Sequence, residues 1–154
     1  MPLIALTAAL LSALLMAAPA PAPAATPLKT RITVEVPSTV KAGRSFIANA
    51  AAQLDSRLHR PRTDYLRAAM YYGGVSRCPK AVPFEVKSWE LVAEHEYDDV
   101  RDPSVRVTFG GSVKFTKRGS HRFCAYVYLD HYTGGFLPSS HPVKARASKL
   151  VTAR

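Results

Sequence analysis

Residues 118–131, RGSHRFCAYVYLDH, carry the most apolar strand pattern of the 154-residue chain. Side chains alternate between the two faces of a strand, so this stretch divides into two sets. The odd-numbered set, which is the more apolar, comprises His121, Phe123, Ala125, Val127 and Leu129. The even-numbered set comprises Arg122, Cys124, Tyr126 and Tyr128. The pattern predicts a central strand that is buried on its odd-numbered face and presents Cys124 on the other.

Cys124 has histidines and an aspartate close by in sequence, which is the composition of a cysteine-type catalytic site. The alternation separates them, because His121 points to the opposite face of the strand. Asp130 and His131 lie about 20 Å further along an extended chain. A nucleophile and its base must approach to about 2.6–3.2 Å. The local residues therefore do not form a catalytic dyad.

Other catalytic patterns are missing from the sequence. There is no G-x-S-x-G elbow and no Gly-rich phosphate loop, and the three Gly-Gly pairs are typical of turns. His59 and His95 stay open as distant bases for Cys124, without a local protease signature to support them. We therefore expect a non-catalytic protein, with a secreted hydrolase as a remote alternative.

The N-terminal residues MPLIALTAALLSALLMAAPAPAPAA contain no charged side chain. An apolar run followed by a small-x-small site at Ala22-Pro23-Ala24 predicts a secretory signal peptide over residues 1–25. The run is shorter than the roughly 20 apolar residues that a stable membrane span needs. No Lys or Arg precedes it, which departs from the usual signal pattern. An uncleaved N-terminal anchor is the alternative to a secretory signal. We expect residues 26–154 to form one domain without a transmembrane span, secreted or held non-covalently at the cell envelope.

Cys78 and Cys124 are the two cysteines of the chain. Two cysteines in an exported protein are more often a disulfide than free thiols. We therefore predict a Cys78–Cys124 disulfide, which should stabilise the fold by about 4 kcal/mol on a chain-entropy argument.

Alternation with period two continues through the rest of the predicted domain. The expected strands cover residues 30–36, 45–53, 65–72, 105–109, 112–116, 121–129 and 143–151. Gly110-Gly111 is expected to form the turn between two of them, and Ser88 as an N-cap makes a short helix compatible with residues 88–97. About seven short strands predict an all-β fold, an antiparallel immunoglobulin-like sandwich, with a small barrel as the alternative architecture.

Two stretches carry a resemblance to a known kind of protein. Residues 32–50, ITVEVPSTVKAGRSFIANA, resemble the opening of bacterial immunoglobulin-like domains, where a first strand ends at a proline and a turn glycine precedes the second strand. Residues 113–128, VKFTKRGSHRFCAYVY, are similar to the closing hairpin of small secreted bacterial proteins of this type. The resemblance implies a fold and an envelope location. It departs at His121, where a tyrosine is expected, and in the lack of a cysteine on the second strand.

The charge of the chain is strongly basic, with 21 Lys and Arg against 11 Asp and Glu and a formal net charge of +10. Such an excess favours attraction to anionic polymers or membrane surfaces. No helix-turn-helix, zinc-finger or RNP-like motif accompanies it, so a specific nucleic-acid partner is not expected. The expected partner is an anionic envelope polymer or another envelope protein. Alternatively, the basic residues only keep a secreted domain soluble.

The most promising contact surface in the sequence is a basic loop, RLHRPRTDYLR, at residues 57–67. Arginines interleaved with an aromatic residue suit phosphate or carboxylate groups. The predicted contact residues are Arg57, His59, Arg60, Arg62, Tyr65 and Arg67. An aromatic face is expected beside them if the strands at 65–72 and 121–129 are neighbours; it would carry Tyr71, Tyr72, Tyr126, Tyr128 and Tyr132. We thus expect a binding module, with an accessory domain that has no dedicated ligand as the alternative.

The acidic run EHEYDDVRD, residues 94–102, is the remaining candidate for chemistry. It lacks EF-hand spacing, and the chain lacks zinc patterns such as H-E-x-x-H. A solvated acidic surface is the prediction, with a weak calcium site as the alternative. No metal ligand and no cofactor are predicted.

Overall fold

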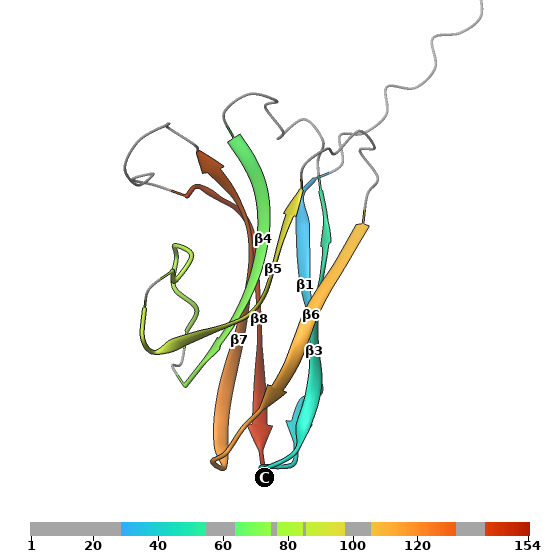
Figure 1. Cartoon of the computed structure of the whole chain (residues 1–154), viewed down its shortest axis with the longest axis vertical. Coiled ribbons are helices and arrows are strands. Elements are labelled where there is room, and N and C mark those ends of the chain that lie inside the picture. The colour runs from blue at the N-terminus through green and yellow to red at the C-terminus, as the bar shows by residue number, and fades with distance from the viewer. Residues whose placement is uncertain (1–28, 55–63, 75–76, 85, 98–105, 132–140) are drawn as a thin grey trace, which may run out of the picture.

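The computed structural model describes residues 29–54, 64–74, 77–84, 86–97, 106–131 and 141–154 (Figure 1). Its strands are β1 (Arg31–Glu35), β2 (Thr39–Val40), β3 (Ser45–Gln53), β4 (Asp64–Gly73), β5 (Trp89–Tyr97), β6 (Arg106–Lys114), β7 (Gly119–His131) and β8 (Val143–Ala153). They form a three-stranded sheet in the order β1-β3-β6 and a five-stranded sheet in the order β2-β8-β7-β4-β5. In the described residues no helix is long and apolar enough to cross a membrane.

The two sheets pack face to face, so the predicted sandwich is confirmed and the barrel alternative is not adopted (Figure 1). The strand order is compatible with a sandwich of the immunoglobulin-like type. β1 pairs antiparallel with β3, whereas β2 pairs parallel with the end of β8. The chain therefore changes sheets at Val36-Pro37-Ser38, where proline has no N–H to donate to a ladder.

β7 is the central strand that the sequence predicts, with β8 on one side and β4 on the other. Its odd-numbered face lies in the core between the sheets, and Phe123 is fully buried there. The ring of Phe123 lies 6.1 Å from that of Phe46 and 5.8 Å from that of Tyr72, measured between centroids. The predicted division of this strand into two faces is confirmed.

His121 has a defined place at the end of this aromatic group. Its ring stacks flat on Phe115, with the centroids 3.7 Å apart and the planes 6° from parallel. A planar imidazole covers the face of Phe115 as an aromatic ring does, which accounts for a histidine where the resemblance expects a tyrosine.

The helix predicted around 88–97 is wrong, because these residues form the edge strand β5. β5 pairs with β4 from Leu66↔Tyr97 to Gly73↔Trp89, so β4 supplies the backbone hydrogen bonds that a helix would make internally. In a helix Glu90 and Glu94 would stack, whereas in the strand Glu94 and Glu96 share a face. Both of these carboxylates pair with the same arginine, Arg67.

The turn predicted at Gly110-Gly111 is also wrong. β6 continues through both glycines and pairs with β3 without interruption. A Cβ atom on Gly110 would lie 2.3 Å from the carbonyl oxygen of Ala48, and one on Gly111 would lie 2.7 Å from that of Val92 in β5. Glycine is needed here because two backbones approach closely, not because the chain turns.

Candidate functional site

Residues 77–84 and 86–88, called here the covering segment, lie between β4 and β5. Figure 1 shows this segment, in yellow-green, on the side of the five-stranded sheet away from β1, β3 and β6. A disulfide joins Cys78 to Cys124 with the Cα atoms 5.8 Å apart, which confirms the predicted bond. Since Cys124 is on the outer face of β7, the bond attaches the segment to the middle of one sheet and does not link the two sheets.

The covering segment buries a second apolar cluster on this outer face. The cluster comprises Ala69, Tyr71, Val82, Trp89, Cys124, Tyr126 and Tyr128. The Tyr126 hydroxyl donates a hydrogen bond to the carbonyl of Pro79 at 3.1 Å, and Phe84 packs edge-on against Tyr128. Burial of a tyrosine is favourable when its hydroxyl group has a hydrogen-bond partner.

The predicted aromatic contact face therefore needs correction. β4 and β7 are neighbours as expected, but Tyr126 and Tyr128 are fully buried. Tyr72 is on the inner face of the sheet, against Phe115, and Tyr132 lies outside the described residues. Strand alternation places tyrosines on one face, but it does not say that a later segment folds over them.

Burial of these phenols makes stability sensitive to alkaline pH. Burial raises the pKa of Tyr126 to about 12, although the charge of Arg146 acts against the rise, and burial with the charge of Glu94 raises that of Tyr71 to about 12. Folded and unfolded chains both keep the protons below about pH 10, so stability is then unaffected. Between about pH 10 and about pH 12 only the unfolded chain releases them, so the free energy of unfolding falls.

We expect this decline to reach about 1.4 kcal/mol per pH unit for each buried tyrosine. Urea unfolding at stepped alkaline pH, followed with tyrosinate absorbance, measures it. The control is Tyr126→Phe, which cannot ionise at that position and should show a shallower decline. A stability that stays level between about pH 10 and about pH 12 contradicts the prediction.

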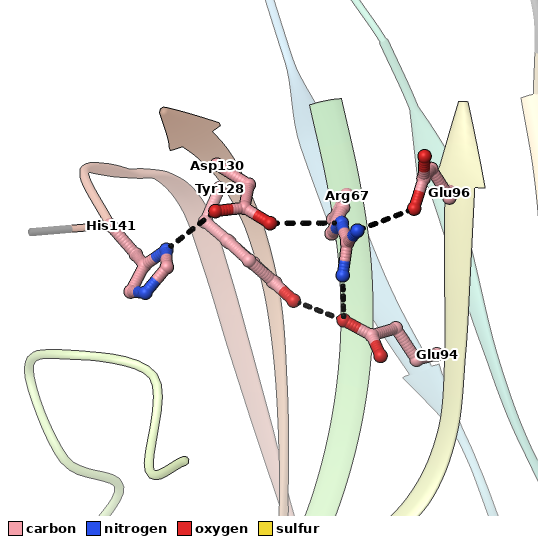
Figure 2. A network of polar contacts seen from close by, with 6 residues as sticks. All are labelled: Arg67, Glu94, Glu96, Tyr128, Asp130 and His141. Atoms are coloured by element: carbon pink, nitrogen blue, oxygen red, sulfur yellow. Dashed lines mark hydrogen bonds and ion pairs between the residues drawn. The ribbon is translucent and has the colours of Figure 1, made fainter. Parts of the chain in front are cut away.

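A polar network lies beside the tyrosine cluster on the same face (Figure 2). The Arg67 guanidinium forms ion pairs with Glu96, Glu94 and Asp130, the last at 3.2 Å. Tyr128 donates a hydrogen bond to Glu94. Burial alone would lower the pKa of Arg67, but the three carboxylates raise it.

His141, two residues before β8, completes this network. Its Nδ1 lies 3.4 Å from an Asp130 carboxylate oxygen (Figure 2), and its ring lies 4.4 Å from that of Phe84. Three carboxylates surround one guanidinium, so even with His141 charged the network is net negative. An anionic ligand is therefore disfavoured here, and Arg67 holds β4, β5 and β7 together.

The other residues of the predicted contact loop are placed as follows. Tyr65 is 41% exposed on β4, opposite Asp130. The basic residues Arg57, His59, Arg60 and Arg62 lie outside the described residues, so contact through them stays a prediction.

The described part of the chain has a different basic site, called here the arginine pocket, next to the disulfide. It is a hollow of about 260 Å³ lined by Arg77, Cys78, Arg122, Arg146, Ala147 and Ser148. No acidic side chain is among these lining residues, and none of the ion pairs between described residues involves the three arginines. Within the described part of the chain, no carboxylate neutralises these three charges.

Three elements bring these arginines together. Arg122 precedes Cys124 by two residues on the outer face of β7, and Arg77 directly precedes Cys78. β8 places Arg146 opposite Tyr126 and Ser148 opposite Cys124. Arg146 Nη1 donates a hydrogen bond to the Pro79 carbonyl at 3.0 Å, which orients its guanidinium.

Part of the arginine pocket could be predicted from the sequence. The predicted disulfide alone brings Arg77 and Arg122 close to each other, because each lies within two residues of one of its cysteines. Arg146 has no such signal, since its position depends on the pairing register of β8 with β7.

An aromatic hollow of about 530 Å³ lies on the β4 and β5 side of the covering segment. It is lined by Tyr71, Pro83, Phe84, Val86, Lys87, Trp89 and Leu91. Leu91 is 53% exposed there. Its lining is mainly apolar, in contrast to the arginine pocket.

The structure also bears on the catalytic alternatives. Cys124 is half of a disulfide and is therefore not a thiol nucleophile. His95 pairs with Ala68, a residue of the inner face, so it lies on the opposite side of the sheet from Cys124. Among the described side chains no group of three or more His, Cys, Asp or Glu is placed to hold a metal ion.

No known protein family, curated protein or solved structure matches this chain.

Proposed function

We propose that this chain is an exported, non-catalytic binding module, a bacterial immunoglobulin-like domain that holds an anionic partner at the cell envelope. The single observation that supports the proposal most is the arginine pocket. The export signal predicted over residues 1–25 and the disulfide both suit an oxidising compartment outside the cytoplasm.

The chemistry of the arginine pocket suits an anion. Guanidinium groups donate paired hydrogen bonds to phosphate or carboxylate oxygens, and these charge-assisted bonds are stronger than neutral ones. The backbone positions of Arg77 and Arg122 are set by a covalent bond and a central strand, so only their side chains have to become ordered when a ligand binds. The net charge of +10 attracts anionic partners from a distance.

The test compares two triple variants of the full chain. Arg77→Ala/Arg122→Ala/Arg146→Ala removes the pocket, and Arg31→Ala/Arg44→Ala/Lys114→Ala removes three exposed positive charges from the other sheet and its turn. Binding to purified cell wall and to phosphatidylglycerol vesicles is measured at low and rising salt. We expect the pocket variant to bind about 100-fold more weakly and the matched variant to change little.

Two outcomes would contradict the proposal. If both triple variants lose the same affinity, binding depends on overall charge and not on the pocket. If the wild-type chain binds neither material at low salt, the alternative of an accessory domain without a dedicated ligand is favoured.

A further inference from the structure

We infer that the arginine pocket is one end of a longer track that binds a chain of phosphodiester-linked polyol units. This inference rests on the proposed function and names its ligand class. A second hollow, of about 360 Å³, is lined by Lys80, Val143, Lys144, Ala145 and Arg146. Arg146 lines both hollows, so the two are neighbours along the outer face of β8.

The track presents positive charge at several points. It comprises Arg77, Lys80, Arg122, Lys144 and Arg146, and no acidic side chain is among the described residues that line either hollow. The acids of the Arg67 network are engaged with that arginine. One small anion would occupy only one hollow, whereas a chain with repeated charges would engage both.

The three arginines of the pocket can bind one phosphate of such a chain. Their guanidinium groups come from the covering segment, β7 and β8, and so approach the arginine pocket from different elements. A phosphodiester keeps two charged non-bridging oxygens, and guanidinium groups donate charge-assisted hydrogen bonds to such oxygens. Carboxylate groups can accept the same bonds, so a carboxylate polymer is the comparison ligand in the test.

The lining favours a polyol phosphate over a nucleic acid. Surfaces that bind single-stranded nucleic acid stack bases on aromatic side chains, and no aromatic residue is among the described residues that line either hollow.

The experiment measures binding of the full chain to glycerol phosphate and to poly(glycerol phosphate) of increasing length. Lys80→Ala/Lys144→Ala should weaken binding of the long polymer by about 5- to 10-fold and leave binding of glycerol phosphate unchanged. Arg122→Ala should weaken both. The matched control is Lys41→Ala/Lys117→Ala, which removes two exposed charges elsewhere, and thermal unfolding checks that all variants fold.

Each result has a separate meaning. Equal binding of long polymer by wild type and Lys80→Ala/Lys144→Ala, or wild-type affinity that does not rise with polymer length, overturns the track but leaves the arginine pocket in place. Equally tight binding of polygalacturonate or single-stranded DNA of the same charge overturns the assignment to polyol phosphate. Failure of the wild type to bind any anion contradicts the proposed function itself.

Discussion

Replacing both cysteines by alanine is expected to lower the free energy of unfolding by about 4 kcal/mol. The disulfide spans 46 residues of sequence, so its removal returns much conformational freedom to the unfolded chain. This loss is large against the roughly 5–15 kcal/mol by which folded domains are stable. Alanine is preferred to serine because Cys124 is fully buried, and a serine hydroxyl there would need a hydrogen-bond partner.

Urea unfolding of Cys78→Ala/Cys124→Ala and of the wild type measures this loss. Because the bond attaches the covering segment to one sheet only, we expect the sandwich to remain folded in the variant. The tyrosine cluster should become accessible, which binding of a hydrophobic dye and tyrosine fluorescence report. Wild-type protein treated with a reductant is the matched control and should behave like the variant. A loss below about 1 kcal/mol would show that the bond adds little beyond the packing of the covering segment.

Replacing Phe123 by alanine is expected to cost about 3–5 kcal/mol. Phe123 is fully buried on the inner face of β7, with the rings of Phe46, Phe115 and Tyr72 around it. The substitution leaves a cavity that these rigid neighbours cannot fill completely, so packing is lost in addition to the transfer free energy.

The measurement is again urea unfolding, with Leu150→Ala as the matched control. Leu150 is on the neighbouring strand β8, opposite Arg122, and is 46% exposed. Its truncation should change the free energy of unfolding by no more than about 0.5 kcal/mol. Similar losses in the two variants would contradict the division of β7 and β8 into a core face and an outer face.

The prediction of β7 succeeded because strand alternation is a local property. A period of two assigns Phe123 and Cys124 to opposite faces whatever the rest of the chain does. The disulfide was predicted from the number of cysteines and the predicted compartment, and the sandwich from the number and spacing of short strands. Each of these depends on neighbouring residues or on composition.

The wrong predictions all concern residues whose structure depends on contact with a segment that is distant in the sequence. Residues 89–97 carry a pattern that either a helix or a strand can accommodate, and pairing with β4 decides between them. Gly110 and Gly111 have the composition of a turn, but the approach of Ala48 and Val92 requires glycine within a strand. The local sequence pattern carries no information about these contacts.

The candidate site was harder to predict than the core for the same reason. The composition of one basic loop predicted that Arg67 contacts a ligand, together with tyrosines on a shared face. Pairing of β4 with β5 surrounds Arg67 with carboxylates, and the covering segment buries Tyr126 and Tyr128. The pairing of β8 with β7 places Arg146 beside Arg122 and Arg77. The local sequence assigned the side chains of a strand to its two faces. Only long-range pairing decided which charges are neutralised and which side chains are buried, because both depend on residues far apart in the chain.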